Sequence, residues 1–313
     1  MVSDLRARPD VAAAYGGVLL IWSTTPLGIK WSTELGFVQG LAIRMLIATV
    51  LLVLIQLAMR RRLPLDRGAV LTYLAGSLGI FWAMLSVYWA AQHLPSGLMA
   101  VVFGMAPMFT ALMSALLLGE RGDLLRKVAG GAIGIAGLAL IFSDSLAVPP
   151  GARLAILAVL LAAVLYGLGA VLMKRIASEV DHVSMTTGSM LVCAPLFIIT
   201  WWWLDLSLPV APPLRAVAAV LYLSVAGSVV GFMLYFYLLK HVRASSAALI
   251  TLVTPVAALL LGAWLNDETL PLNVWWGVVV ILAGLALFNA PMRALASVQG
   301  AVAADPARHQ HDQ

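Results

Sequence analysis

Charged side chains are scarce in this sequence. Only 11% of its 313 residues are Asp, Glu, Lys or Arg, whereas about a quarter of the residues of a soluble domain are usually charged. Hydrophobic residues make up 62% of the chain, and its mean hydropathy is +1.00. Too few charges remain to cover a surface that faces water, so most of this chain lies in another environment.

Cysteine and histidine are also rare. The one cysteine, Cys193, lies in an apolar run, where it can form neither an internal disulfide nor a thiolate metal site. The five histidines form no cluster with metal-ligand spacing, and neither an H-E-x-x-H motif nor a nucleophile elbow is present. We therefore expect no metal, no cofactor and no enzyme activity.

Acidic residues are missing from the middle of every apolar run. All 14 fall in expected loops, termini or helix ends, and Glu120 and Glu268 come closest to the membrane. These two are expected to interact with the start of the next helix or, for Glu120, with Arg126. A proton-driven exporter of lipophilic cations would be expected to hold a carboxylate inside the membrane, so the sequence argues against that class.

Long apolar runs, in contrast, fill the chain almost from end to end. A run of about 18 or more apolar residues is long enough to cross the bilayer core as a helix. The first run follows Arg6 and Arg8 without an A-x-A cleavage site, so it is interpreted as a retained helix behind a cytoplasmic segment 1–10. The polar segment 297–313 is predicted to be a disordered cytoplasmic tail. The pattern predicts an all-α integral membrane protein with ten transmembrane helices, near 11–29, 37–58, 68–91, 95–118, 124–142, 152–173, 183–203, 214–239, 244–265 and 271–289.

The positive charges fall on one side of these ten spans. If the N-terminus is cytoplasmic, only Lys30, Arg153 and Arg215 lie outside, and Arg44 alone lies within a span. The other lysines and arginines lie inside, as the positive-inside rule predicts for a bacterial inner-membrane protein with both termini in the cytoplasm. This bias explains the basic pI of about 9.6 without any nucleic-acid partner. Six tryptophans fall at the predicted outer ends, as an interfacial belt would: Trp201, Trp202, Trp203, Trp264, Trp275 and Trp276.

The two halves of the chain resemble each other. The segment 93–120 aligns with 241–268 without a gap, so that Pro107 matches Pro255 and Glu120 matches Glu268. Each half holds five predicted helices, over 11–142 and 152–289. Because five is odd, the second half must enter the membrane in the opposite direction to the first. Such an inverted repeat is common among secondary transporters, with the substrate site between the halves.

These features resemble the EamA-domain branch of the drug/metabolite transporter superfamily. The motifs that carry the resemblance are "W-S…K" from Trp22 to Lys30, the arginine Arg44 in the second helix, and "A-P-x-F…G-E" from Ala106 to Glu120. A second-half echo runs from Thr254 to Glu268, and the resemblance covers roughly residues 12–290. It implies export of a small metabolite or amino acid through a central cavity lined by helices 1, 3, 4, 6, 8 and 9.

Aromatic and small polar residues on these helices are the candidate pocket. Flat aromatic walls with a few hydroxyl groups suit an amphipathic metabolite, although helix packing is the more common role of any single aromatic. The candidate substrate-binding residues are Trp22, Arg44, Trp82, Ser86, Tyr88, Trp89, Met105, Tyr166, Ser228, Tyr235 and Thr251. Pro26, Pro107 and Pro255 are candidate hinges or kinks, because each removes a backbone donor within a span.

Two further features each have a structural and a functional interpretation. Gly130 and Gly134 form a GxxxG motif, and Gly277 and Gly284 mark helix 10, so helices 5 and 10 are expected to serve as scaffold or homodimer contacts. Arg44 lies about 10 Å from the outer start of its helix. It could snorkel to the lipid headgroups or turn inward toward carbonyls or a substrate carboxylate.

Several functions remain open from the sequence. The leading hypothesis is a secondary transporter, an exporter of a small metabolite such as an amino acid, that works by alternating access. Flipping of a lipid or amphiphile is the main alternative. A membrane enzyme or a sensor with a transporter-like fold ranks below both, because an enzyme would need clustered ionisable groups at one depth.

Overall fold

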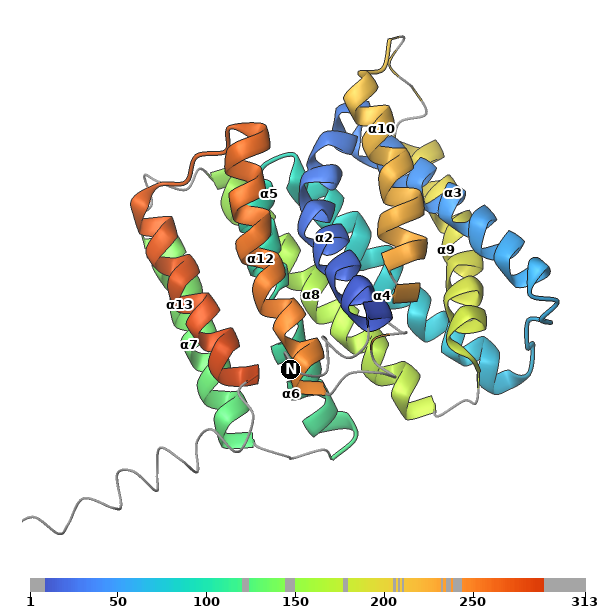
Figure 1. Cartoon of the computed structure of the whole chain (residues 1–313), viewed down its shortest axis with the longest axis horizontal. Coiled ribbons are helices and arrows are strands. Elements are labelled where there is room, and N and C mark those ends of the chain that lie inside the picture. Colours follow the sequence, from blue (N-terminus) through green and yellow to red (C-terminus); the bar gives the residue numbers. More distant parts are fainter. Residues whose placement is uncertain are drawn as a thin grey trace, which may run out of the picture.

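Helices and the short turns between them make up the computed structural model (Figure 1). The structure describes residues 9–119, 124–143, 150–176, 180–204, 207, 209, 211–231, 233–234, 238 and 244–289. In chain order the elements are α2 (Pro9–Ser32), the 3-10 turn η1 (Thr33–Leu35), α3 (Phe37–Ala58), α4 (Arg67–Ala91), α5 (Ser96–Phe103), α6 (Ala106–Leu117), α7 (Leu124–Ser143), α8 (Pro150–Ile176), α9 (His182–Leu204), α10 (Leu214–Tyr222), the π-helix η2 (Leu223–Val230), α12 (Ala244–Asn266) and α13 (Leu272–Asn289).

Helix is found in each of the ten ranges predicted from the sequence. Within the part of the chain that the structure describes, six helical segments are long and apolar enough to cross a membrane: Pro9–Leu35, Phe37–Ala58, Arg67–Ala91, Ser96–Leu117, Gly151–Ile176 and Val183–Leu204. A helix satisfies its own backbone polar groups, which is why apolar stretches adopt it in lipid. The predicted tail over 297–313 and residues 1–8 of the predicted N-terminal segment lie outside the described residues.

Two helices are less regular than the sequence predicted. The segment expected as one helix over 95–118 is interrupted at Gly104 and Met105, which separate α5 from α6. Pro107 lies in the first turn of α6, where its missing N–H and fixed φ are tolerated. The segment expected over 214–239 changes from α10 into the π-helix η2.

Polar contacts join the helices at one end of the bundle, which we name the Lys30 end. It holds the C-terminal ends of α2, α4, α9 and α12 and the first residues of α3, α5, α10 and α13. Gln39 of α3 donates its Nε2 to the carbonyl of Ser207 at 3.0 Å. Arg215 of α10 forms an ion pair with Glu34 of η1 and lies over the ring of Trp31, 5.5 Å from its centroid.

The opposite end, which we name the Arg61 end, holds the C-terminal end of α3 and the start of α9. Gln56 donates its Nε2 to the hydroxyl of Ser184 at 2.9 Å, and Arg61 pairs with Asp181 at 3.2 Å. Together with the contact of Gln39 at the Lys30 end, these bonds hold α3 alongside α9 near both ends.

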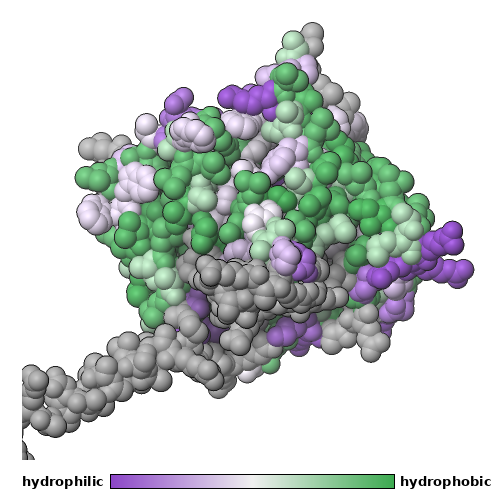
Figure 2. All heavy atoms as spheres, viewed as in Figure 1, coloured by the Kyte–Doolittle hydropathy of each residue, from purple (hydrophilic) through white to green (hydrophobic). Residues whose placement is uncertain are grey.

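Apolar side chains cover most of the face seen in Figure 2, with strongly hydrophilic ones toward the upper and the lower right edges. The six tryptophans predicted to form a belt all lie at the Lys30 end, where α9 and α12 finish and α13 begins. Trp203, for instance, is 83% exposed. This arrangement is typical of a protein whose middle faces lipid and whose ends reach the interface.

Glycines allow α7 and α13 to lie unusually close, side by side at the left of Figure 1. A Cβ on Gly130 would lie 2.8 Å from the carbonyl oxygen of Gly284, and one on Gly137 would lie 2.7 Å from that of Gly277. The scaffold interpretation of these glycines therefore holds within one chain. Because the partner helix already occupies them, these four glycines are not free to contact a second copy.

Candidate functional site

Arg44 turns into the bundle rather than toward lipid headgroups. Only 4% of the residue is exposed. Its Nε donates to the hydroxyl of Ser228 at 3.2 Å, and its Nη1 donates to the hydroxyl of Tyr88 at 3.3 Å. The guanidinium also lies 5.9 Å from the centroid of the Tyr88 ring. We name these three residues the Arg44 centre. Because Arg44 is buried and bonded to helices inside the bundle, its side chain does not snorkel to the lipid headgroups.

Three helices bring the Arg44 centre together. The first turn of α3 can approach the end of α2 closely because Gly40 has no side chain; a Cβ there would lie 2.5 Å from the carbonyl oxygen of Ser32. Tyr88 is fully buried on α4, and Ser228 is buried on the π-helix η2. Because a π turn is wider than an α turn and occurs frequently at functional sites, η2 is a notable place for a hydroxyl that contacts a charge.

No carboxylate pairs with Arg44 among the residues that the structure describes. The ion pairs of this part of the chain lie elsewhere, between Arg61 and Asp181 and between Arg215 and Glu34. Hydroxyl oxygens supply dipoles but no charge to balance a guanidinium, which stays protonated at any physiological pH. The Arg44 centre therefore carries a net positive charge inside the bundle.

Gly227 and Thr25 are neighbours of this centre that the sequence did not single out. A Cβ on Gly227 would lie 3.5 Å from Nη2 of Arg44 and 3.7 Å from the hydroxyl oxygen of Thr25. Thr25 donates that hydroxyl to the carbonyl of Ile21 at 2.7 Å. A glycine followed by serine on one predicted helix was the only signal available, and it is too common to identify a site.

Other predicted pocket residues lie apart from the Arg44 centre. Trp82 is 50% exposed, and its ring meets Phe81 edge-on. Ser86 donates its hydroxyl back to the carbonyl of Trp82, one turn earlier in α4. Trp89 packs its ring on His93, with centroids 5.0 Å apart. Of the predicted residues on α4, Tyr88 alone contacts Arg44.

The remaining predicted residues are spread over other helices. Met105 is buried, and its methyl end would lie 3.2 Å from a Cβ on Gly134 of α7. Tyr166 is partly exposed and packs on Phe103, with ring centroids 5.7 Å apart. Trp22 is half-buried and packs against the cluster that α2 forms with Leu238 and Ile250. Tyr235 and the side chain of Thr251 lie outside the described residues.

The three predicted hinge prolines have different settings. Pro26 and Pro255 lie inside continuous helices, α2 and α12, whereas Pro107 follows the interruption between α5 and α6. A Cβ on Gly104, within that interruption, would lie 3.3 Å from Cγ of Pro255. Two repeat-related proline segments therefore meet inside the bundle.

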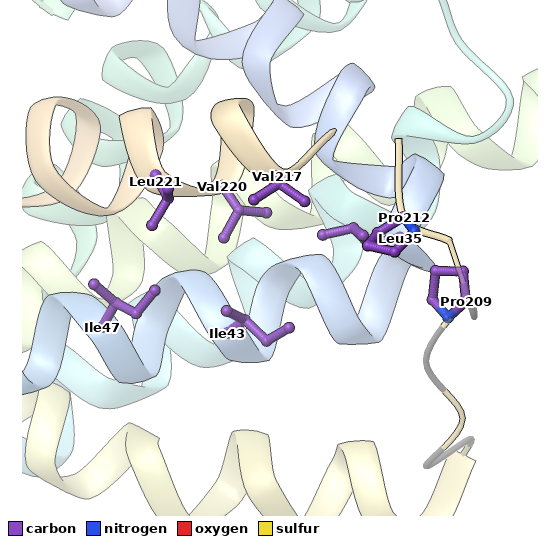
Figure 3. A pocket seen from close by; sticks show the side chains of 8 residues that line it. All are labelled: Leu35, Ile43, Ile47, Pro209, Pro212, Val217, Val220 and Leu221. Carbon is purple, nitrogen blue, oxygen red and sulfur yellow. The ribbon is translucent and has the colours of Figure 1, made fainter. Parts of the chain in front are cut away.

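A separate groove of about 210 Å³, whose described lining residues are all apolar, lies between α3 and α10 at the Lys30 end (Figure 3). Its lining residues are Leu35, Ile43, Ile47, Pro209, Pro212, Val217, Val220 and Leu221. The side chains of Ile43 and Val220 point toward each other across it. No side chain among these described lining residues could recognise a charged or hydrogen-bonding group, so this lining differs in chemistry from the Arg44 centre.

Comparisons with known proteins agree with a transporter. The chain is 31% identical to an uncharacterized inner membrane transporter, YedA, of Escherichia coli K12, over 86% of this chain and 87% of that protein. It is 30% identical to a probable terminal-alkyne amino-acid exporter of Streptantibioticus cattleyicolor, over 87% and 90% of the two chains. A chain in a solved crystal structure shares the fold, with a TM-score of 0.61 at 21% identity, over 89% of this chain and 96% of that one.

The model of the EamA-like transporter family matches residues 13–143 and again residues 153–290. These two matches fall on the two halves that the sequence repeat defines, and the helices described above fill both. The resemblance seen in the motifs is thus confirmed across nearly the whole chain, which belongs to the EamA-like transporter family of the drug/metabolite transporter superfamily.

Proposed function

We propose that this protein is a secondary transporter, an exporter of a small carboxylate-bearing metabolite such as an amino acid, and that Arg44 binds the substrate carboxylate. One observation carries the proposal. Arg44 is buried inside the bundle, held by two hydroxyl groups, and has no acidic partner among the described residues.

The physical argument concerns the cost of that charge. Removing a charged group from water costs several kcal/mol unless a counter-charge and hydrogen bonds compensate. The hydroxyls of Tyr88 and Ser228 compensate only part of it. An anionic ligand would supply the missing charge, and the planar guanidinium is suited to a carboxylate, which it can bind through two parallel hydrogen bonds. Without a ligand, the positive charge of Arg44 is only partly compensated, so the site favours binding of an anion.

The substrate class follows from the chemistry around Arg44. Tyr88 and Ser228 can each reorient a hydroxyl to donate to an anion. The named amino-acid exporter among the relatives supports a carboxylate substrate that also carries an amino group. A lipophilic cation does not suit this centre, because the nearest fixed charge would repel it.

The transport cycle that we propose uses ten spans in two inverted five-helix halves, 11–142 and 152–289. The family model matches each half separately. Four helical segments are candidates for the spans beyond the six long ones: α7, Leu214–Val230, Val253–Asn266 and Val274–Asn289. In this scheme the halves rock about the Arg44 centre and expose it to each side in turn.

The proposed location is the bacterial inner membrane, with both termini in the cytoplasm. The Arg61 end, with Arg60, Arg61 and Arg62 after α3, would then face the cytoplasm, and the Lys30 end would face outward. A relative described as an inner membrane transporter supports this location.

Lipid or amphiphile flipping is the second candidate function, and the apolar groove in Figure 3 is the observation that favours it. The apolar side chains described in its lining would suit an acyl chain. The groove and the Arg44 centre share α3, through Ile43 and Ile47 on one face and Arg44 on another. Because Arg44 and Ile47 are three residues apart, these faces of α3 are adjacent, so an amphiphile could place its head at one and its tail at the other.

The test of the proposed function combines ligand-dependent melting with transport. Purified protein would be melted with amino acids, simple monocarboxylates and quaternary amines, and stabilising ligands would be assayed for flux in proteoliposomes. Hydrogen bonds to charged groups contribute about 1.5–3 kcal/mol, so Arg44→Gln is expected to weaken carboxylate binding about 10- to 100-fold. Ser228→Ala should weaken it less. Ser224→Ala is the matched control, because Ser224 is buried on the same π-helix and bonds to the carbonyl of Val220.

The melting temperature without ligand distinguishes a binding role from a structural one. An unbalanced buried charge is costly, so ligand-free Arg44→Gln should be at least as stable as the parent protein. A structural anchor would behave in the opposite way, since breaking a buried charged network costs about 3–5 kcal/mol. The proposal would be refuted if Arg44→Gln had a lower melting temperature than the parent protein and still bound carboxylates. It would also be refuted if a quaternary amine raised the melting temperature of the parent protein more than any carboxylate did. Flux of a labelled phospholipid without flux of any metabolite would favour the flippase.

A further inference from the structure

The turn between α4 and α5 is held from both sides by charged residues of other helices. Lys30 of α2 donates its Nζ to the carbonyls of Ala91 at 2.7 Å and Leu94 at 3.0 Å. Ala91 is the last residue of α4, where unpaired carbonyls and the helix dipole concentrate negative charge. A lysine is the complementary group for that position.

Glu268, just after α12, supplies the opposite charge to the other side of this turn. Its Oε2 accepts from the hydroxyl of Ser96 at 2.9 Å and from the backbone N–H of Gly97 at 3.3 Å. These residues open α5, where unpaired N–H groups favour an anion. The carboxylate therefore binds the start of α5, which lies 172 residues earlier in the chain. The sequence had pointed instead to the helix that follows Glu268.

Two further hydrogen bonds close these interactions into a ring. Trp31 donates its Nε1 to Oδ1 of Asn266 at 2.9 Å, and Asn266 donates its Nδ2 to Oε1 of Glu268 at 3.0 Å. We name Lys30, Trp31, Ser96, Asn266 and Glu268 the Lys30–Glu268 clamp. It links α2, the turn between α4 and α5, and the end of α12 at a single level of the bundle.

The backbone around the clamp is shaped to fit it. A Cβ on Gly262 would overlap Oε2 of Glu268 and would lie 2.8 Å from the hydroxyl oxygen of Ser96. Directly beneath, a Cβ on Gly97 would lie 2.6 Å from Cα of Leu259. The two glycines therefore let α5 and α12 approach until the carboxylate reaches the start of α5, with an apolar layer below the polar one.

We propose that the Lys30–Glu268 clamp is the closed gate of the Lys30 end and that it must open in each transport cycle. This inference rests on the proposed function. A polar closure suits a gate because water can replace each of its hydrogen bonds when the helices part, so that opening leaves no group unsatisfied. Separation of α2 and α12 from the turn between α4 and α5 would expose the layer that contains Leu259.

The test measures access to that layer and needs no substrate. A reporter Leu259→Cys is placed in a Cys193→Ser background, and its reaction with a membrane-impermeant methanethiosulfonate added at the Lys30 end is timed. Glu268→Gln keeps the shape of the side chain but removes its charge, and we expect the reporter to react about tenfold faster or more. Asp267→Asn is the matched control: it removes a neighbouring charge, keeps a side chain that tolerates the positive φ of 50° at this residue, and should leave the rate unchanged.

Gly262→Ala is a second variant that keeps every charge. Its added methyl group should displace Glu268 and so raise the reaction rate of the Leu259→Cys reporter. This variant keeps the gate testable if Glu268→Gln folds poorly. Equal reporter rates in the parent protein, Glu268→Gln and Gly262→Ala would overturn the gate. A rate raised equally by Asp267→Asn would overturn the specific role of Glu268.

Cross-linking then connects the clamp to transport. Ser96→Cys and Asn266→Cys tie the start of α5 to the end of α12. Joined by a short cleavable bis-thiol reagent, they should stop flux, and reduction should restore it. Full flux in the cross-linked protein would overturn the need for opening. Absence of flux for every metabolite before cross-linking would count against the proposed function alone, because the reporter rates still decide whether the clamp closes the Lys30 end.

Discussion

At the scale of a single residue, Asp181 shows how one carboxylate can start a helix and join it to another. Its Oδ1 accepts from the backbone N–H groups of Val183 at 3.1 Å and Ser184 at 3.3 Å, and from Arg61 at 3.2 Å. Its Oδ2 accepts from the hydroxyl of Ser184 at 2.7 Å. Partial burial raises the pKa of Asp181, but the bonds from Ser184 and Val183 and the charge of Arg61 lower it more, so the net pKa lies below the ordinary 3.8.

This lowered pKa gives a pH-dependent prediction. A depressed folded-state pKa contributes stability that is present above the unfolded pKa, near 3.8, and is lost as the pH falls through the folded pKa. We expect Asp181→Ala to destabilise the protein by about 1 kcal/mol near neutral pH, the usual cost of losing a cap. Melting in detergent should show a constant difference from the parent protein between about pH 5 and 8 and a smaller one below about pH 4. A difference that persists unchanged into acid would show that the charge of Asp181 contributes nothing.

The residues of the Arg44 centre also show what a sequence can reveal about a site. Arg44, Tyr88 and Ser228 were all predicted as pocket residues, because each is a polar group inside an apolar run. Their mutual contacts were not predictable, since the rotation of three separate helices about their axes depends on packing. The sequence does show, however, that not all of the predicted residues on α4 can face Arg44. At about 100° per residue, Trp82 and Tyr88 point to different sides of α4, so both could not face the same centre.

At the scale of elements, α7 and α13 form a pair whose stability depends on specific glycines. We expect Gly130→Ala to lower the melting temperature, because its Cβ would meet the carbonyl oxygen of Gly284 at 2.8 Å and the chain of Phe288 at 2.9 Å. The helices would have to separate, and overpacking of this kind typically costs about 1–3 kcal/mol. Melting of the purified protein in detergent measures the effect.

Gly131 provides the control for that prediction, since nothing lies within 4 Å of a Cβ added there. Gly131→Ala should be neutral, or slightly stabilising by up to about 1 kcal/mol through helix propensity. Similar melting temperatures for the two alanine variants would contradict close packing between α7 and α13.

Helix existence was more predictable than helix detail. The range 37–58 coincides with α3, because hydropathy and polar breaks alone define such a segment. The sequence did not predict the interruption at Gly104 or the π-helix η2, because hydropathy carries no information about the pattern of backbone hydrogen bonds. Glu268 illustrates a further limit. Its helix-end role was expected, but the helix it caps is distant in the sequence, and no local pattern identifies such a partner.

At the scale of the whole molecule, the distribution of positive charge makes a prediction about orientation. Single cysteines introduced at Thr33, next to Glu34, and at Arg62 lie at opposite ends of the bundle. In intact cells an impermeant thiol reagent should label Thr33→Cys and leave Arg62→Cys unlabelled until the membrane is permeabilised. The buried Cys193 should not react in either case. Labelling in the reverse pattern would invert the proposed topology and, with it, the outward assignment of the Lys30 end.

The π-helix that carries Ser228 has a consequence for how a substrate would sit. A pair of matching halves, inverted in the membrane, would by itself offer a site with two-fold symmetry, in which a ligand could bind equally well in either of two opposed orientations. The described part of α4 is regular α-helix throughout, whereas η2 inserts its wider turns within the second half. That difference removes the two-fold symmetry that two matching halves would have. A bound molecule would therefore have a defined head and tail with respect to the two faces of the membrane.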